Sequence, residues 1–158
     1  MEVGTPKRYF LVKGKGVSRV SFLNSFDNAL LDAKIGDCNL IYVSSIIPEN
    51  CVEVDSLPNL NPGTIIYVVM SRKDGMGPDK IVAGIGVARI KVGSKEYGFI
   101  AEDAGVDERE VRQKVINKLN EMAKSRNAKI LDIKTEIEAL EVPSGFYGTV
   151  IAAVVFLP

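Results

Sequence analysis

The hydrophobic residues of this chain gather in runs of β-branched and aliphatic side chains, separated by short stretches of Gly, Pro, Asn and Asp. Runs of this kind are typical of buried strands, and the stretches between them are typical of turns. They predict strands from residue 39 up to two serines at 44 and 45, and then at 64–71, 81–92, 97–103, 129–140 and 149–156. The segments 56–63, 72–80 and 142–148 are predicted to be loops.

Residues 24–35 have the signals of a helix. Asn24 can cap its first turn, Asp27 stands three residues later in a capping-box position, and Gly36 suits the left-handed conformation that ends many helices. The apolar residues of this segment are compatible with one buried face: Leu23, Leu30, Leu31 and Ile35.

A second and clearer helix begins after Asp107. Asp107 and Glu110 form a capping-box pattern. One face of this helix is apolar and carries Val111, Val115, Leu119 and Met122. Two helices among mostly long strands predict an α+β fold, a layered αββα-like sandwich of mostly antiparallel sheet flanked by helices. The length of 158 residues predicts a single domain over 1–158.

The charge and the apolar content limit the partners of the protein. Lys and Arg total 20, as do Asp and Glu, so we expect neither nucleic acid nor an anionic membrane as a partner. The apolar runs are too short to span a bilayer, and the opening MEVGTPKRYFLVKGKG lacks the apolar core of a secretory signal. Two cysteines do not make a disulfide framework, so we expect a cytoplasmic protein.

Histidine is absent from the sequence. Its absence excludes histidine general bases, Ser-His-Asp triads and most zinc sites. Neither Cys38 nor Cys51 has a clear CxxC partner, so we expect no metal. Catalysis must therefore come from carboxylates, hydroxyls, Lys, Tyr or a group that the chain makes itself.

The dipeptide Ser44-Ser45 interrupts an otherwise apolar segment, and alone it predicts only a turn whose hydroxyls bond nearby backbone. Its surroundings, SFDNALLDAKIGDCNLIYVSSIIP at 25–48, resemble the pyruvoyl-dependent arginine decarboxylase family in FD.ALL, the IG turn, NLI and SSI.P. GFIAEDAG at 98–105 is similar to the segment in which that family carries its catalytic acid. The order of strands and helices matches the family over nearly the whole chain.

The resemblance implies that the chain is a zymogen that cleaves itself. The Ser45 hydroxyl would attack the Ser44 carbonyl and form an ester. β-Elimination would then release Ser44 as a new C-terminus, and hydrolysis of the remaining dehydroalanine would leave a pyruvoyl group where Ser45 was. The products would be fragments 1–44 (the β chain) and 45–158 (the α chain). The pyruvoyl group would form a Schiff base with the α-amine of L-arginine and yield agmatine and CO₂, without metal or pyridoxal phosphate.

The resemblance also assigns roles to particular residues, each of which has an ordinary structural alternative. It implies that Asn39 assists cleavage, although an asparagine at a strand start also satisfies local backbone. Glu102 would protonate Cα after CO₂ leaves, with Asp103 as its rival one residue away; a solvated strand end is the alternative. Asp27 would bind the guanidinium, or only stabilise its helix. Gly36 and Cys38 would offer backbone carbonyls to the same guanidinium.

Further expectations come with the family. A homotrimer of cleaved protomers is implied, with Glu102 donated from a neighbouring subunit's side of the site. Cys38 and Asn28 depart from the family pattern, so histidine, lysine or ornithine remain alternative substrates. A non-catalytic α/β module that binds a small molecule or a sister protein also remains open. Agmatine could serve polyamine biosynthesis or acid resistance.

Overall fold

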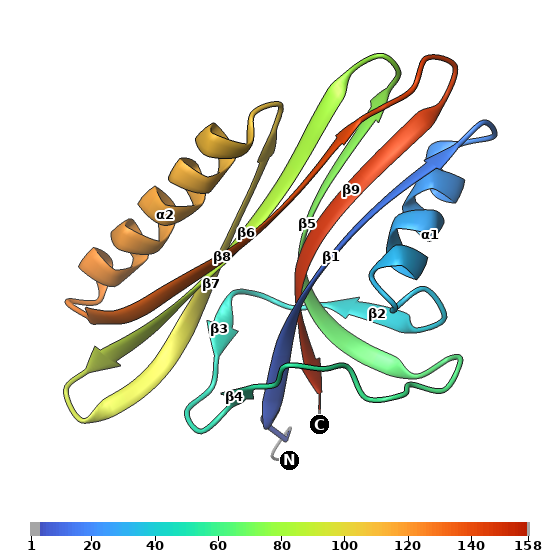
Figure 1. The fold of residues 1–158 in the computed structure, drawn as a ribbon. Helices are drawn as coiled ribbons and strands as arrows, with labels where there is room; N and C mark the ends of the chain where they lie inside the picture. The colour runs from blue at the N-terminus through green and yellow to red at the C-terminus, as the bar shows by residue number, and fades with distance from the viewer. Residues whose placement is uncertain (1–3, 158) are drawn as a thin grey trace.

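The computed structural model describes residues 4–157. Residues 1–3 and 158 of the predicted domain lie outside the described residues, and residues 1–3 are also the first three of the N-terminal segment that was judged not to be a secretory signal. Long strands dominate the chain, and two helices interrupt them (Figure 1). In order, the elements are β1 (Arg8–Ser18), α1 (Phe22–Asp32), β2 (Asn39–Tyr42), β3 (Ile46–Ile47), β4 (Val52–Glu53), β5 (Ile65–Met76), β6 (Lys80–Val92), β7 (Lys95–Gly105), α2 (Glu108–Ser125), β8 (Lys129–Glu141) and β9 (Tyr147–Leu157).

The strands form two sheets. The five-stranded sheet has the order β2-β5-β9-β1-β4, and the four-stranded sheet has the order β3-β7-β6-β8. Only the short β2 and β4 pair with their neighbours in parallel, so the sheets are mostly antiparallel as predicted. The predicted α+β class is confirmed.

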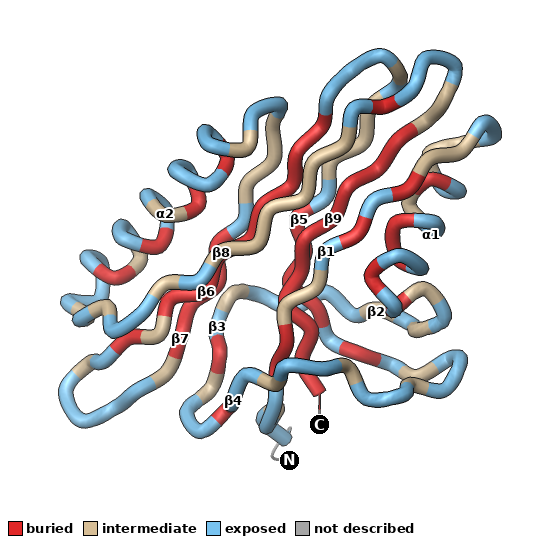
Figure 2. The backbone as a smooth tube through the Cα atoms, in the orientation of Figure 1, coloured by how far each residue is buried: buried red, intermediate tan, exposed pale blue. Residues whose placement is uncertain are grey.

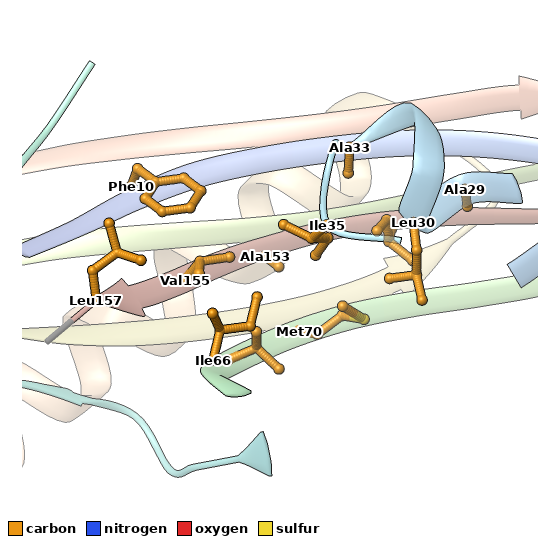
Figure 3. Packing of buried hydrophobic residues seen from close by; sticks show 12 residues of the cluster. Phe10, Ala29, Leu30, Ala33, Ile35, Ile66, Met70, Ala153, Val155 and Leu157 are labelled. Atoms are coloured by element: carbon orange, nitrogen blue, oxygen red, sulfur yellow. The ribbon is translucent and has the colours of Figure 1, made fainter. Parts of the chain in front are cut away.

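The fold has four layers, which are α1, the five-stranded sheet, the four-stranded sheet and α2, and a hydrophobic cluster lies between each layer and the next. One cluster joins α1 to the five-stranded sheet through residues such as Leu30, Ile35 and Val155 (Figure 3). A second cluster lies between the sheets and includes Ile100, and a third joins α2 to the four-stranded sheet. Figure 1 shows the two helices on opposite outer faces, and Figure 2 shows the buried stretches following the central strands. The arrangement is therefore an αββα sandwich.

The first helix begins earlier than its sequence pattern predicts. Ser21 is the N-cap, and its hydroxyl accepts a hydrogen bond from the Asn24 backbone N–H at 3.1 Å. The predicted Asn24 cap is therefore wrong, and Asp27 lies inside the helix, not in a capping box. The left-handed residue after the helix is Lys34 (φ 64°) and not the predicted Gly36. Position 36 requires glycine for another reason, because a Cβ there would collide with Leu31.

The predicted buried face of α1 is half right. Leu30 and Ile35 are buried, whereas Leu23 and Leu31 are exposed, because α1 packs so closely on β1 that small residues occupy the contact. A Cβ on Gly14 would collide with the Ala29 carbonyl. β1 itself was not predicted, since its KGKG stretch looks like a loop until α1 is placed over the glycines.

The second helix agrees with its prediction. The Asp107 carboxylate accepts from the Glu110 N–H at 2.9 Å and caps the helix. Three of the four predicted face residues, Val111, Val115 and Leu119, are buried, and the fourth, Met122, is half-buried at the edge. Ala123, which was not predicted, is also buried. This helix covers β6 and β7 and so lies beside the second segment that resembles the decarboxylase family.

Candidate active site

The serine pair lies where the chain crosses from one sheet to the other. β2 is an edge strand of the five-stranded sheet, and β3 is an edge strand of the four-stranded sheet. The last bond to the first sheet is from Val43 N to Val68 O at 3.0 Å, and the first bond to the second sheet is from Ile100 N to Ser45 O at 2.8 Å. Within residues 4–157, the Ser44 backbone makes no hydrogen bond to another residue. The Ser44–Ser45 peptide is thus outside both ladders.

Glu102 is brought to the serine pair by the pairing of β3 with β7. Ile46 faces Phe99 across this pair, and Ser45 continues it opposite Ile100. Beyond this point β7 runs on as a free edge, and Glu102 lies there. A cavity of about 390 Å³ is lined by Ser45, Ile100, Ala101, Glu102, Lys118, Glu121 and Met122. The structure thus joins Ser45 and Glu102 within one protomer, although the resemblance implies a Glu102 from the neighbouring subunit's side.

The two acids at 102 and 103 point to opposite faces of β7. Successive side chains of a strand alternate; Ile100 belongs to the core between the sheets, and Phe99 and Ala101 belong to the core under α2. Glu102 is therefore on the Ile100 face. Asp103 is on the α2 face, where its Oδ1 lies 3.2 Å from the Lys118 ammonium, and it does not line the cavity with Ser45.

The pKa of Glu102 is shifted upward, in the direction that suits a proton donor. Desolvation by the surrounding protein raises its pKa, and the positive charge of Lys118 partly opposes that rise. Part of the side chain is still exposed in the isolated protomer.

The other predicted residues lie elsewhere. The Asn39 side chain donates to Gly63 O at 3.1 Å at the start of β2, five positions before Ser44, and the structure does not bring it to the serine pair. Asp27 is exposed on α1, and Gly36 and Cys38 are half-buried between α1 and β2. These residues are on the helix side of the five-stranded sheet, whereas Glu102 is on the other sheet. One protomer therefore holds the predicted site in two separate groups.

Two contributions to the site were missed in the sequence. The Ile100 N–H that holds Ser45 O is a backbone group and has no sequence signal. Lys118 does have one, because it stands three residues after the buried Val115 and so lies beside the packed face of α2. Among the described residues, no group of three or more His, Cys, Asp or Glu side chains is placed to hold a metal ion. No helix in the described part of the chain is long and apolar enough to cross a membrane.

Comparison with known proteins finds similar sequences over nearly the whole chain. Residues 8–158 match the model of a family described as pyruvoyl-dependent arginine decarboxylase. A protein of that name from Methanopyrus kandleri is 39% identical over 155 residues, which cover 98% of this chain and 99% of that protein. One from Methanocella arvoryzae is 36% identical over 96% of both chains. Pyruvoyl-dependent arginine decarboxylase 2 from Methanosarcina mazei is 39% identical over 67% of this chain and 59% of its own length.

Proposed function

Because this chain belongs to the pyruvoyl-dependent arginine decarboxylase family, we propose that it cleaves itself between Ser44 and Ser45 and converts L-arginine to agmatine and CO₂. The observation that carries the proposal is the single cavity that Ser45 shares with Glu102, beside a peptide bond that belongs to neither sheet. The residue that would become the reactive group and the acid that would serve it are adjacent.

The residues around position 45 fit a pyruvoyl group. Cleavage would release the backbone nitrogen of Ser45 as ammonia and turn its Cβ into a methyl group but retain its carbonyl, and the Ile100 N–H already holds that carbonyl at 2.8 Å. The pyruvoyl group supplies the electron-withdrawing carbonyl that decarboxylation of an amino acid requires. The N–H of Ile100 keeps this terminus at the mouth of the cavity and stabilises negative charge on the retained oxygen.

Glu102 would supply the proton that replaces the departing carboxylate. A carboxylic acid can donate only while it is protonated, and the raised pKa of Glu102 extends the pH range in which it is neutral. We assign the role to Glu102 and not to Asp103, because Glu102 lines the cavity with Ser45, whereas Asp103 does not line it and pairs with Lys118.

The fold explains how two fragments would remain one molecule. Fragment 1–44 contains β1, α1 and β2. β1 pairs with β9 along its whole length, and α1 buries Ala29 and Leu30 against the five-stranded sheet. β2 pairs in parallel with β5. Breaking the bond after Ser44 removes none of these contacts.

We further propose that the guanidinium-binding half of the site comes from a second protomer of a homotrimer. Asp27, Gly36 and Cys38 are separated from Ser45 by the five-stranded sheet, so a neighbour must supply them. Large apolar side chains are exposed along β2 and β5, where such a contact would form: Ile41, Tyr42, Val43, Ile65 and Tyr67. In this assembly Asp27 would pair with the substrate guanidinium. The role of Asn39 in cleavage would also be exerted across this interface.

Intact-mass analysis of the purified protein under denaturing conditions tests the proposal. We expect the masses of fragments 1–44 and 45–158, with the larger fragment modified by a carbonyl reagent. Ser45→Ala should remain one chain and be inactive. Ser44→Ala is the matched control: it should still cleave, since only the carbonyl of residue 44 takes part. An uncut parent chain without a trappable ketone would refute self-cleavage.

The substrate is tested separately by product analysis. Arginine, lysine, ornithine and histidine are supplied in turn to the cleaved protein, and release of CO₂ and the amine is measured. We expect agmatine from arginine, and Asp27→Asn should raise the KM for arginine because a neutral amide pairs weakly with a guanidinium. Equal turnover of a substrate without a guanidinium would refute the assignment to arginine. We place the reaction in the cytoplasm, in agreement with two free cysteines.

A further inference from the structure

The ammonium of Lys118 makes two contacts on neighbouring residues of β7. It donates to the backbone carbonyl of Glu102 at 2.7 Å and lies 3.2 Å from Asp103 Oδ1. The pairing of β3 stops opposite Ile100, so the Glu102 carbonyl faces the free edge of the sheet, where no strand can donate to it. The Lys118 ammonium supplies the hydrogen bond to the Glu102 carbonyl that a neighbouring strand would otherwise donate.

Lys118 also lies between two cavities. It lines the cavity of about 390 Å³ that holds Ser45 and Glu102. It lines a second one of about 360 Å³, on the other side of Glu102, together with Met70, Ser71, Arg72, Asp103 and Ala104. Both cavities are lined by Glu102 and Lys118, so this lysine is the cation that the two cavities share.

We propose that Lys118 is a positioning residue for Glu102: by fixing the Glu102 carbonyl at the free edge of β7, it aims the carboxyl group into the cavity with Ser45. Asp103 supports it by holding the ammonium from the α2 face. The inference rests on the proposed function, in which Glu102 donates the proton. It adds a residue from α2 to a site otherwise built from β3 and β7.

Desolvation raises the pKa of Glu102, and the charges around it determine how far that rise is opposed. Lys118 and Glu121 line the cavity from α2, and Asp103 follows Glu102 on β7; Arg72 lines the adjoining cavity from β5, but its guanidinium stacks over Phe26 at 3.8 Å. Arg72 is held bidentately by Asp74 at 3.1 and 3.0 Å. The cation that acts on the Glu102 pKa is Lys118, which lowers it. Removal of Lys118 should therefore raise the pKa of Glu102 further.

The first test measures Glu102 directly, without any pyruvoyl group. The carboxyl ¹³C shift of Glu102 is titrated in the full-length Ser45→Ala protein, alone and combined with Lys118→Met. The midpoint should move to higher pH when Lys118 is replaced. Lys114→Met is the matched control on the same helix, because Lys114 pairs with Glu110 at 3.0 Å and lines neither cavity. An unchanged midpoint in Lys118→Met would overturn the inference.

The second test measures turnover by the cleaved enzyme. An acid that must be protonated loses activity as pH rises through its pKa, so Lys118→Met should shift the alkaline limb of the kcat profile to higher pH. Because the Glu102 carboxyl group would no longer be held in position, kcat should fall by about ten- to a hundredfold, with KM for arginine changed by less than about twofold. Lys118→Arg should restore the position of the limb. Should Lys118→Met fail to fold, Asp103→Asn, which weakens the same ammonium contact, should lower kcat in the same way.

The two tests separate the inference from the proposed function. If the parent decarboxylates arginine but the Glu102 midpoint and the kcat profile are the same in Lys118→Met and Lys114→Met, the role of Lys118 is refuted alone. If the midpoint shifts but the parent neither cleaves nor decarboxylates, the proposed function is refuted and the positioning contact stands. A shift in both measurements supports both.

Discussion

Replacement of Ile47 by alanine tests whether the docking of β3 positions the reactive terminus. Ile47 is completely buried between the sheets, pairs with Gly98 on β7 and stands two residues after Ser45. After the proposed cleavage, the larger fragment would begin at residue 45, and the attachment of β3 to β7 would hold the new terminus. Ile47 provides most of the apolar part of that attachment, because its neighbour Ile46 is 43% exposed.

The expected cost follows from the burial. Ile47→Ala removes three carbons, and at about 0.8 kcal/mol for each buried CH₂ this amounts to about 2.4 kcal/mol. The cavity that remains adds to this, so the free energy of unfolding should fall by about 3 kcal/mol. Because part of the loss falls on the docking of β3, kcat for arginine should fall by at least about tenfold.

Two measurements and one control decide the outcome. Urea unfolding of the uncut Ser45→Ala chain, at one fixed protein concentration, gives the loss of stability. Turnover is measured on the cleaved enzyme. Ile81→Ala is the control, since Ile81 is 2% exposed and packs in a separate cluster with Val142 and Val150. If Ile47→Ala and Ile81→Ala lower kcat equally at equal loss of stability, β3 has no special role.

Three further changes should have distinct effects. Glu102→Gln should leave cleavage intact and lower kcat by about 10²- to 10⁴-fold. Burial raises the Glu102 pKa, so the stability that this carboxyl contributes is present at low pH and is lost as pH rises through the raised pKa. Glu102→Gln should therefore unfold at higher urea than the parent at neutral pH, and this advantage should vanish below the usual titration range of glutamate. Thr149→Val removes the hydroxyl that lies 2.7 Å from Asp74 Oδ1 and 2.7 Å from Ser25 Oγ, and should cost about 1–3 kcal/mol in urea unfolding. Gly14→Ala forces α1 away from β1, because the new methyl group meets the backbone of α1; it should cost about 1–3 kcal/mol and lower the melting temperature.

The sequence predicted the elements whose signals are local. The strand at β6 and the helix after Asp107 were found because an apolar run and a capping side chain act within a few residues. β1 was missed because Gly14 and Gly16 have meaning only against the helix that packs on them. The cap of α1 was misplaced by three residues, since both Ser21 and Asn24 can cap and local sequence does not choose between them.

In the candidate site, too, some features could be predicted from local sequence and others depended on the packing of the fold. Ser45 and Glu102 were named from their motifs, and the structure places them on one cavity. The choice between Glu102 and Asp103 required the face of β7 that each occupies, which follows from pairing with β6 and packing under α2. Helical spacing places Lys118 beside the packed face of α2, but its contact with Glu102, 16 positions away along the chain, required the structure.

The proposed cleavage after Ser44 would have a consequence for how the molecule can be made. While the bond is intact, a covalent tether keeps β1 and α1 at high effective concentration beside β5 and β9. A chain cut at this bond must find its other piece by diffusion after denaturation, so its refolding becomes second order and slows on dilution. The uncut chain should refold at a rate independent of dilution, which makes assembly before cutting the productive order of events.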